Sequence, residues 1–188
     1  TGYATAEEVL RDAETALHRA RVLGGSHFEV FDTAVLKSEQ SELQLEGELE
    51  GALQRREFEL FYQPIVSLTS NEVLGFESLL RWRHPVLGLI SPLDFLPIAE
   101  RTGFIVPLGA WILRDACLRL AEWHRELPLR DDLWVAVNVS SAQWNDPTFS
   151  DQIEEALRES GLEPGRLVLE LTEGIAIANP TAVTTQLM

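Results

Sequence analysis

The chain has 188 residues, of which 45% are hydrophobic and 24% charged, and its formal net charge is -15 at pH 7. This balance is typical of globular protein and suffices for one domain or parts of two. The negative charge argues against unassisted binding to a DNA or RNA polymer. No apolar run approaches 18 residues and no leader opens the chain, so we expect a cytoplasmic protein with no membrane segment.

The first 56 residues have mainly helical signals. Thr5 and Glu8 form a capping box before an amphipathic pattern that stops at a glycine pair, and the strand-like letters HFEVF follow. One helix and one short strand bury too little surface for a core, so we expect further chain upstream. Residues 33–56 are acidic with one apolar stripe, which predicts a connecting helix.

The remainder alternates between strand and helix signals. Ser91, Pro92 and Asp94 supply an N-cap, a first-turn proline and a first-turn acid for one helix, and Gly161 ends another. Cys117 lies in an apolar helical pattern and reads as a small core residue. Alternation of apolar strands with helices predicts an α/β fold with a mainly parallel sheet, open or closed into a barrel. The strand-like runs are residues 57–68, 72–82, 133–140 and 166–173.

Polar residues interrupt these strand runs at a few places, and the ones that we place late in a strand are Gln63, Glu77, Asn138 and Glu170. Because ligands gather at the carboxyl ends of parallel strands, polar residues late in a strand are candidates for a site. Each has a structural alternative: Glu77 a surface acid on an edge strand, Asn138 a turn former, and Glu170 an outward residue of an alternating strand. Two carboxylates and an amide oxygen suit Mg²⁺ or Mn²⁺ and are poor zinc ligands.

Other kinds of site find little support. The four histidines have no HExxH or paired metal-ligand spacing, no serine or cysteine nucleophile motif is present, and no Gly-rich phosphate loop occurs. Hydrolysis by metal-bound water is the chemistry that remains.

Five stretches resemble the EAL-domain cyclic di-GMP phosphodiesterases, in that family's order and with compatible spacing. They are FYQPIVSL, GFESLLRWRHP with GLISPLDFLPIAERTG, WILRDACLRLAEW, VAVNVSSAQW and LVLELTEG. The motif that names the family reads Glu77-Ser78-Leu79 here, with serine in place of the usual alanine.

The resemblance implies the N-terminal portion of a TIM-like (β/α)8 barrel and a role for each matching residue. Glu77, Asn138 and Glu170 would bind catalytic Mg²⁺ or Mn²⁺, Arg81 a ligand phosphate and Gln63 a guanine, and Glu173 would steady a loop over the site. Two cations can orient a hydroxide for in-line attack on a phosphodiester. The implied reaction converts cyclic di-GMP to linear pGpG; the alternative is a receptor that binds the dinucleotide or a partner protein without cutting it.

The resemblance also implies an organisation in three parts: residues 1–32, similar to the end of a GGDEF diguanylate cyclase domain, the connecting helix of residues 33–56, and the N-terminal half of an EAL domain in residues 57–188. The family's paired aspartates, a lysine and a further glutamate would lie beyond Met188. We therefore expect the parent protein to be active and these 188 residues alone to be inactive. A homodimer through the EAL domain and a membrane tether upstream are further expectations.

Overall fold

The structure is a computed structural model that describes residues 33–127, 130 and 132–171, with side chains from residue 42 onward. The chain divides into two compact units, Thr1–Gln44 and Leu45–Met188. The GGDEF-like helix and strand expected in residues 1–32 lie outside the described residues, as does Glu173. Helix α2, Thr33–Gln54, covers most of the segment expected to be a connecting helix.

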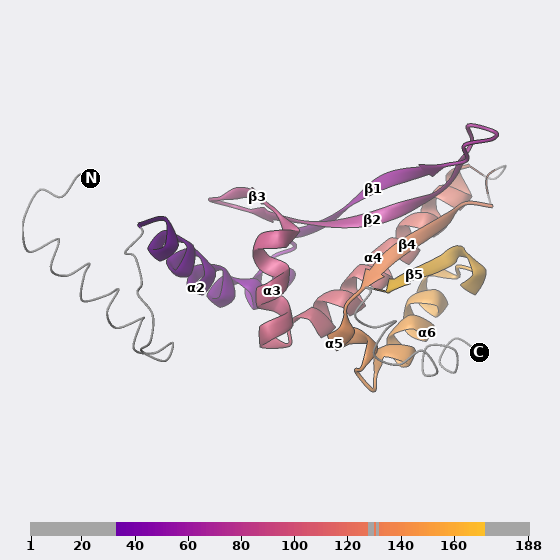
Figure 1. Cartoon of the computed structure of the whole chain (residues 1–188). Helices are drawn as coiled ribbons and strands as arrows, with labels where there is room; N and C mark the ends of the chain where they lie inside the picture. Colours follow the sequence, from indigo (N-terminus) through magenta and orange to yellow (C-terminus); the bar gives the residue numbers. More distant parts are fainter. Residues whose placement is uncertain (1–32, 128–129, 131, 172–188) are drawn as a thin grey trace, which may run out of the picture. The chain divides into compact units, whose positions relative to one another are not determined.

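Within the described residues, the second unit contains a five-stranded sheet in the order β1-β2-β4-β5, with β3 paired to β2 (Figure 1). The parallel pairs are β2 with β4 and β4 with β5, whereas β1 and β3 each run antiparallel to β2. The strands are β1 Phe58–Val66, β2 Val73–His84, β3 Gly88–Ile90, β4 Trp134–Val139 and β5 Leu167–Leu171.

The expectation of a mainly parallel sheet was wrong for the first two strand runs. Only residues 67–72 separate β1 from β2, and a parallel pair needs a crossover connection of a dozen or more residues. The short turn therefore forces a hairpin, in which the Ser67 carbonyl accepts a hydrogen bond from the Asn71 N–H at 2.9 Å. In each of the two parallel pairs, helices connect the first strand to the second, which agrees with the expected α/β class.

The helices begin and end where local chemistry favours it. Helix α3, Pro92–Thr102, has Ser91 as its N-cap, with the side chain accepting from the Leu93 N–H, and ends at Gly103 in the left-handed conformation. Gly161 ends helix α6 in the same way. These caps confirm the expected start of α3 and end of α6. The remaining helices of this unit are α4 Ile105–Glu126, α5 Ser141–Trp144, α6 Phe149–Ser160 and the 3₁₀ turn η2 Pro164–Arg166.

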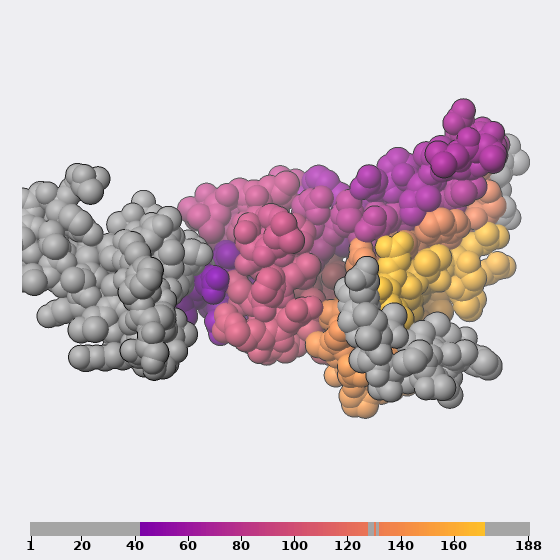
Figure 2. Space-filling view, in the orientation of Figure 1, coloured from indigo at the N-terminus to yellow at the C-terminus, as the bar shows by residue number. Residues whose placement is uncertain are grey.

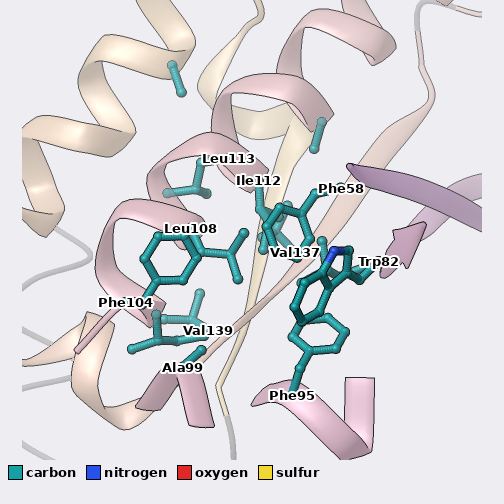
Figure 3. Packing of buried hydrophobic residues seen from close by; sticks show 14 of the residues in the cluster. Phe58, Trp82, Phe95, Ala99, Phe104, Leu108, Ile112, Leu113, Val137 and Val139 are labelled. Carbon is teal, nitrogen blue, oxygen red and sulfur yellow. The ribbon is translucent and has the colours of Figure 1, made fainter. Parts of the chain in front are cut away.

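The core lies between the sheet and helices α3 and α4. Phe58, Trp82 and Phe95 form an aromatic cluster, with ring centroids 5.5 to 5.8 Å apart (Figure 3). Leu49 of α2 is also buried in this core, so the last turns of α2 belong to the second unit. Cys117 is fully buried, as expected, and burial raises the pKa of its thiol to about 12.

The strands of the sheet have two different faces. On β2, Ser78, Leu80 and Trp82 are buried on the helix side, and the residues between them point to the opposite face. Figure 1 views the sheet from that opposite side, with α4 behind the strands, and Figure 2 shows the surface of the same side. Among the described residues, no helix is both long and apolar enough to cross a membrane.

Candidate functional site

Three of the expected site residues lie side by side on the sheet face opposite α4. Glu77 of β2 is in register with Ala136 of β4, and Asn138, two residues further along β4, is in register with Glu170 of β5. Residues in register, or two apart, point to the same face. The side-chain amide of Asn138 donates a hydrogen bond to Oε1 of Glu77 at 2.8 Å, so these two side chains meet.

Gln63 joins this group from β1, where it is directly opposite Glu77 in the antiparallel pair. The expectation that the site residues come late in their strands fails for Glu77, which is in the first half of β2 because that strand continues past its pairing with β4 to pair with β3. Gln63 is in the second half of β1, but that strand runs antiparallel to β2. Register between neighbouring strands, rather than position along each strand, gathers these side chains.

Arg81 lies on the same face of β2, four residues beyond Glu77, and is half-buried. Its guanidinium donates to the Leu80 carbonyl at 2.7 Å, and its Cζ lies 5.4 Å from the centroid of the Phe61 ring. Glu59 is directly across from Arg81, but its carboxylate bonds to Arg83 at 2.6 Å. Within the described part of the chain, Arg81 has no carboxylate partner, although the sequence contains 30 Asp and Glu residues.

A cavity of about 310 Å³ opens beside Arg81 and Asn138 and extends toward α3 and α5. Its volume is at the small end of the range for small-molecule sites. The residues that form the other walls of this cavity were not predicted from the sequence. Two sequence features do mark the helices that carry some of them: the proline that starts α3, and the Ser140-x-x-Gln143 capping box that starts α5. These walls include Pro92, Leu96, Glu100, Ile105, Ile112, Ser140 and Gln143.

Ser78, the serine in the family motif, lies on the face of β2 opposite to Glu77 and also lines the cavity. It is buried on the helix side, and its hydroxyl donates to the Ala136 carbonyl at 2.9 Å. The side chain thus links β2 to β4 directly behind Glu77. The sequence change from alanine is therefore accommodated in the core, and the hydroxyl is satisfied.

The donor set of this face suits a hard divalent cation. Glu77, Asn138 and Glu170 offer carboxylate and amide oxygens, which Mg²⁺ and Mn²⁺ prefer. Asn138 would have to turn its amide so that Oδ1 replaces Nδ2 beside Glu77, a rotation that costs one hydrogen bond. Within the residues described, no three His, Cys, Asp or Glu side chains form a metal-binding group, so the two carboxylates and the amide alone make an incomplete cage.

Comparison with known proteins identifies relatives along most of the chain. Residues 46–188 match the family model described as the EAL domain. The bifunctional diguanylate cyclase/cyclic di-GMP phosphodiesterase MucR of Pseudomonas aeruginosa is 37% identical over 183 residues, and the cyclic di-GMP phosphodiesterase NbdA of the same organism is 39% identical over 173 residues. These alignments cover 95% and 92% of this chain but only 26% and 22% of the relatives.

A solved structure gives the same result in three dimensions. The MucR phosphodiesterase in complex with c-di-GMP superposes with a TM-score of 0.73 and 41% identity, covering 77% of this chain and 57% of that chain. This chain therefore spans little more than half of the similar structure. The family match extends over far more than half of the residues, from the last turns of α2 through the sheet that carries Glu77, Asn138 and Glu170. The chain belongs to the EAL domain family.

Proposed function

We propose that the full-length protein containing this chain hydrolyses cyclic di-GMP to linear pGpG with two Mg²⁺ or Mn²⁺ ions. The observation that supports this most directly is the contact between Glu77 and Asn138 with Glu170 next to them in register, on a face that also carries Arg81. The similarity to phosphodiesterases of 37% to 41% identity adds to it.

Each residue has a proposed task. Glu77, Asn138 and Glu170 hold the divalent ions, which would supply an activated water and neutralise charge on the phosphoryl group. Further ligands come from the rest of the full-length protein. Arg81 presents its planar donor fork to a phosphate oxygen. Gln63 contacts a guanine edge, and Glu173, outside the described residues, steadies a loop over the site.

The cavity beside Arg81 has the character of a base-binding site. Leu96, Ile105 and Ile112 provide apolar surface, while Ser140 and Gln143 bring polar groups to the same space. A guanine offers flat apolar faces and polar edges, so it could satisfy both kinds of wall. The phosphate would then lie beside Arg81 and Asn138, which also line the cavity.

The second candidate is a non-catalytic receptor, which would bind the dinucleotide without cutting it. The incomplete cage of the described residues is compatible with either role. A receptor has less need of the Glu77, Asn138 and Glu170 set than a hydrolase has, and this difference favours the hydrolase.

We expect residues 1–188 alone to be inactive. We also propose a homodimer through the EAL domain, which sedimentation analysis can test.

The test is incubation of the full-length protein with cyclic di-GMP in the presence of Mg²⁺ or Mn²⁺, followed by chromatographic separation of pGpG. Calorimetric titration in EDTA measures binding without metal-dependent turnover. Formation of pGpG that stops on addition of EDTA supports the hydrolase. Binding with no product, in either metal, identifies the receptor, and absence of both contradicts a role in cyclic di-GMP recognition.

A further inference from the structure

We propose that Phe61 is a positioning residue, whose ring holds the guanidinium of Arg81 ready for the ligand phosphate. The inference rests on the proposed function, because it assigns a phosphate to Arg81. It concerns a residue that the comparisons and the sequence motifs leave without a role.

The placement of Phe61 is unusual for a large aromatic side chain. It lies on β1, in register with Leu79 of β2, and therefore on the site face rather than the helix face. It is 42% exposed, whereas Phe58, three residues earlier, is buried in the core. Its described ring contact is the cation of Arg81, whose Cζ is 5.4 Å from the ring centroid, within the usual distance for a cation–π interaction.

Strand geometry explains why this pair meets. Phe61 and Leu79 are direct cross-strand neighbours, and Arg81 is two residues further along β2 on the same face. Such diagonal neighbours are about 7 Å apart at their backbones, which a long side chain and an aromatic ring can span. Only one donor group of Arg81 is used within the described residues, in the bond to the Leu80 carbonyl.

A ring is better suited to this task than a carboxylate. A carboxylate would neutralise Arg81 and occupy the same donor fork that binds phosphate, so the ligand would have to displace it. The face of a phenyl ring attracts the cation but leaves the in-plane N–H groups unused. The nearest carboxylate across the strands, that of Glu59, is engaged by Arg83 instead. Arg81 is thus oriented without being neutralised.

The test uses the full-length protein and three variants. Phe61→Leu removes the ring and keeps apolar bulk, Phe61→Tyr keeps a ring, and Ile65→Ala is a control on the same face of β1, where Ile65 is in register with Gly75. We expect Phe61→Leu to weaken binding of cyclic di-GMP in EDTA by roughly 3- to 10-fold. Phe61→Tyr and Ile65→Ala should stay within about two-fold of the wild type.

Two further measurements separate positioning from a merely structural role. With metal present, Phe61→Leu should raise KM and leave kcat nearly unchanged, because a phosphate anchor acts equally on the ground state and the transition state. In an Arg81→Ala background, Phe61→Leu should cause no further loss, because the ring acts through Arg81. Where binding by the Arg81→Ala protein is too weak for calorimetry, kcat/KM supplies the same comparison.

Two outcomes would overturn the proposal. One is an unchanged affinity and KM for Phe61→Leu. The other is an equal loss in the wild-type and Arg81→Ala backgrounds, which would mean that Phe61 contacts the dinucleotide itself. If the wild-type protein neither binds nor hydrolyses cyclic di-GMP, the proposed function fails before the role of Phe61 arises, so the two failures are distinguishable.

Discussion

Glu48 of helix α2 accepts a hydrogen bond from the imidazole of His84, at the end of strand β2. Nδ1 of His84 accepts from the backbone N–H groups of Val86 and Leu87, at 3.2 and 3.1 Å, so that nitrogen carries no proton. Nε2 must therefore be the donor in its 2.5 Å contact with the Glu48 carboxylate. One buried histidine thus fixes both the turn that follows β2 and the last turns of α2.

Replacement of Glu48 by alanine should destabilise the second unit by about 1–3 kcal/mol, because it leaves the buried His84 N–H without its acceptor. Urea unfolding measures this change. Glu46→Ala is the matched control: its partner Arg101 is 57% exposed, and such surface pairs contribute about 0–1 kcal/mol. Equal small effects of the two variants would contradict the importance of the Glu48–His84 contact.

The stability of the protein should depend on pH through Glu57. The hydrogen bond from Arg55, followed by that from the Trp82 indole, lowers the pKa of Glu57 below its ordinary value of 4.5. A carboxyl group with a lowered folded-state pKa stabilises the fold above that ordinary value, and this contribution is lost as the pH falls through the folded-state pKa. The free energy of unfolding should therefore fall more steeply below pH 4.5 in the wild type than in Glu57→Gln. Parallel curves for the two proteins would exclude this contribution.

Glu77→Gln should abolish most of the proposed turnover and leave the fold in place. The glutamine can still accept the hydrogen bond from Asn138 but carries no charge for a metal ion. Loss of a metal ligand should cost more than about 100-fold in kcat, because loss of a mere supporting partner costs about 10- to 100-fold. The thermal midpoint should move by no more than about 3 °C. Insolubility or unfolding of Glu77→Gln would instead indicate a structural role for this residue.

Gly75→Ala should destabilise the sheet where β2 and β4 first pair. A Cβ at this position would lie 2.5 Å from both the carbonyl oxygen and a ring carbon of Trp134, which is too close for either atom. We expect a loss of about 1–3 kcal/mol in denaturant unfolding. Gly47→Ala is the control, because its Cβ would meet nothing within 4 Å and alanine is favoured in a helix. A Gly75→Ala protein as stable as the wild type would show that Trp134 moves aside freely.

The sequence predicted those parts of the fold that local chemistry determines. The Ser91 cap, the first-turn proline and the glycine at 161 all lie where the helices begin or end. The direction of β1 was missed because continuous apolar character was taken as a parallel strand, although the six-residue connection to β2 requires a hairpin. Loop length was the better guide to strand direction.

The sequence was a good guide to which residues form the candidate site and a poorer guide to how their side chains are arranged. Gln63, Glu77, Asn138 and Glu170 could be selected because polar residues in apolar strands are rare, and the structure brings them to one face. Their assigned roles remain predictions. The ring of Phe61 beside Arg81 could not be foreseen, since it depends on the cross-strand register of an antiparallel pair that the sequence reading did not contain.

Successive side chains of β2 point to opposite faces of the sheet, and this limits where residues can be inserted into or deleted from the chain. Insertion of one residue between Gly75 and Glu77 would turn the Glu77 carboxylate toward the buried helix side of the sheet and present Ser78 to the ligand. The turn that joins β1 to β2 is free of this constraint, because Leu68 at its start is 98% exposed and the turn lies at the opposite end of β2 from Arg81. Insertions and deletions should therefore be tolerated in that turn and excluded from the strand only a few residues later.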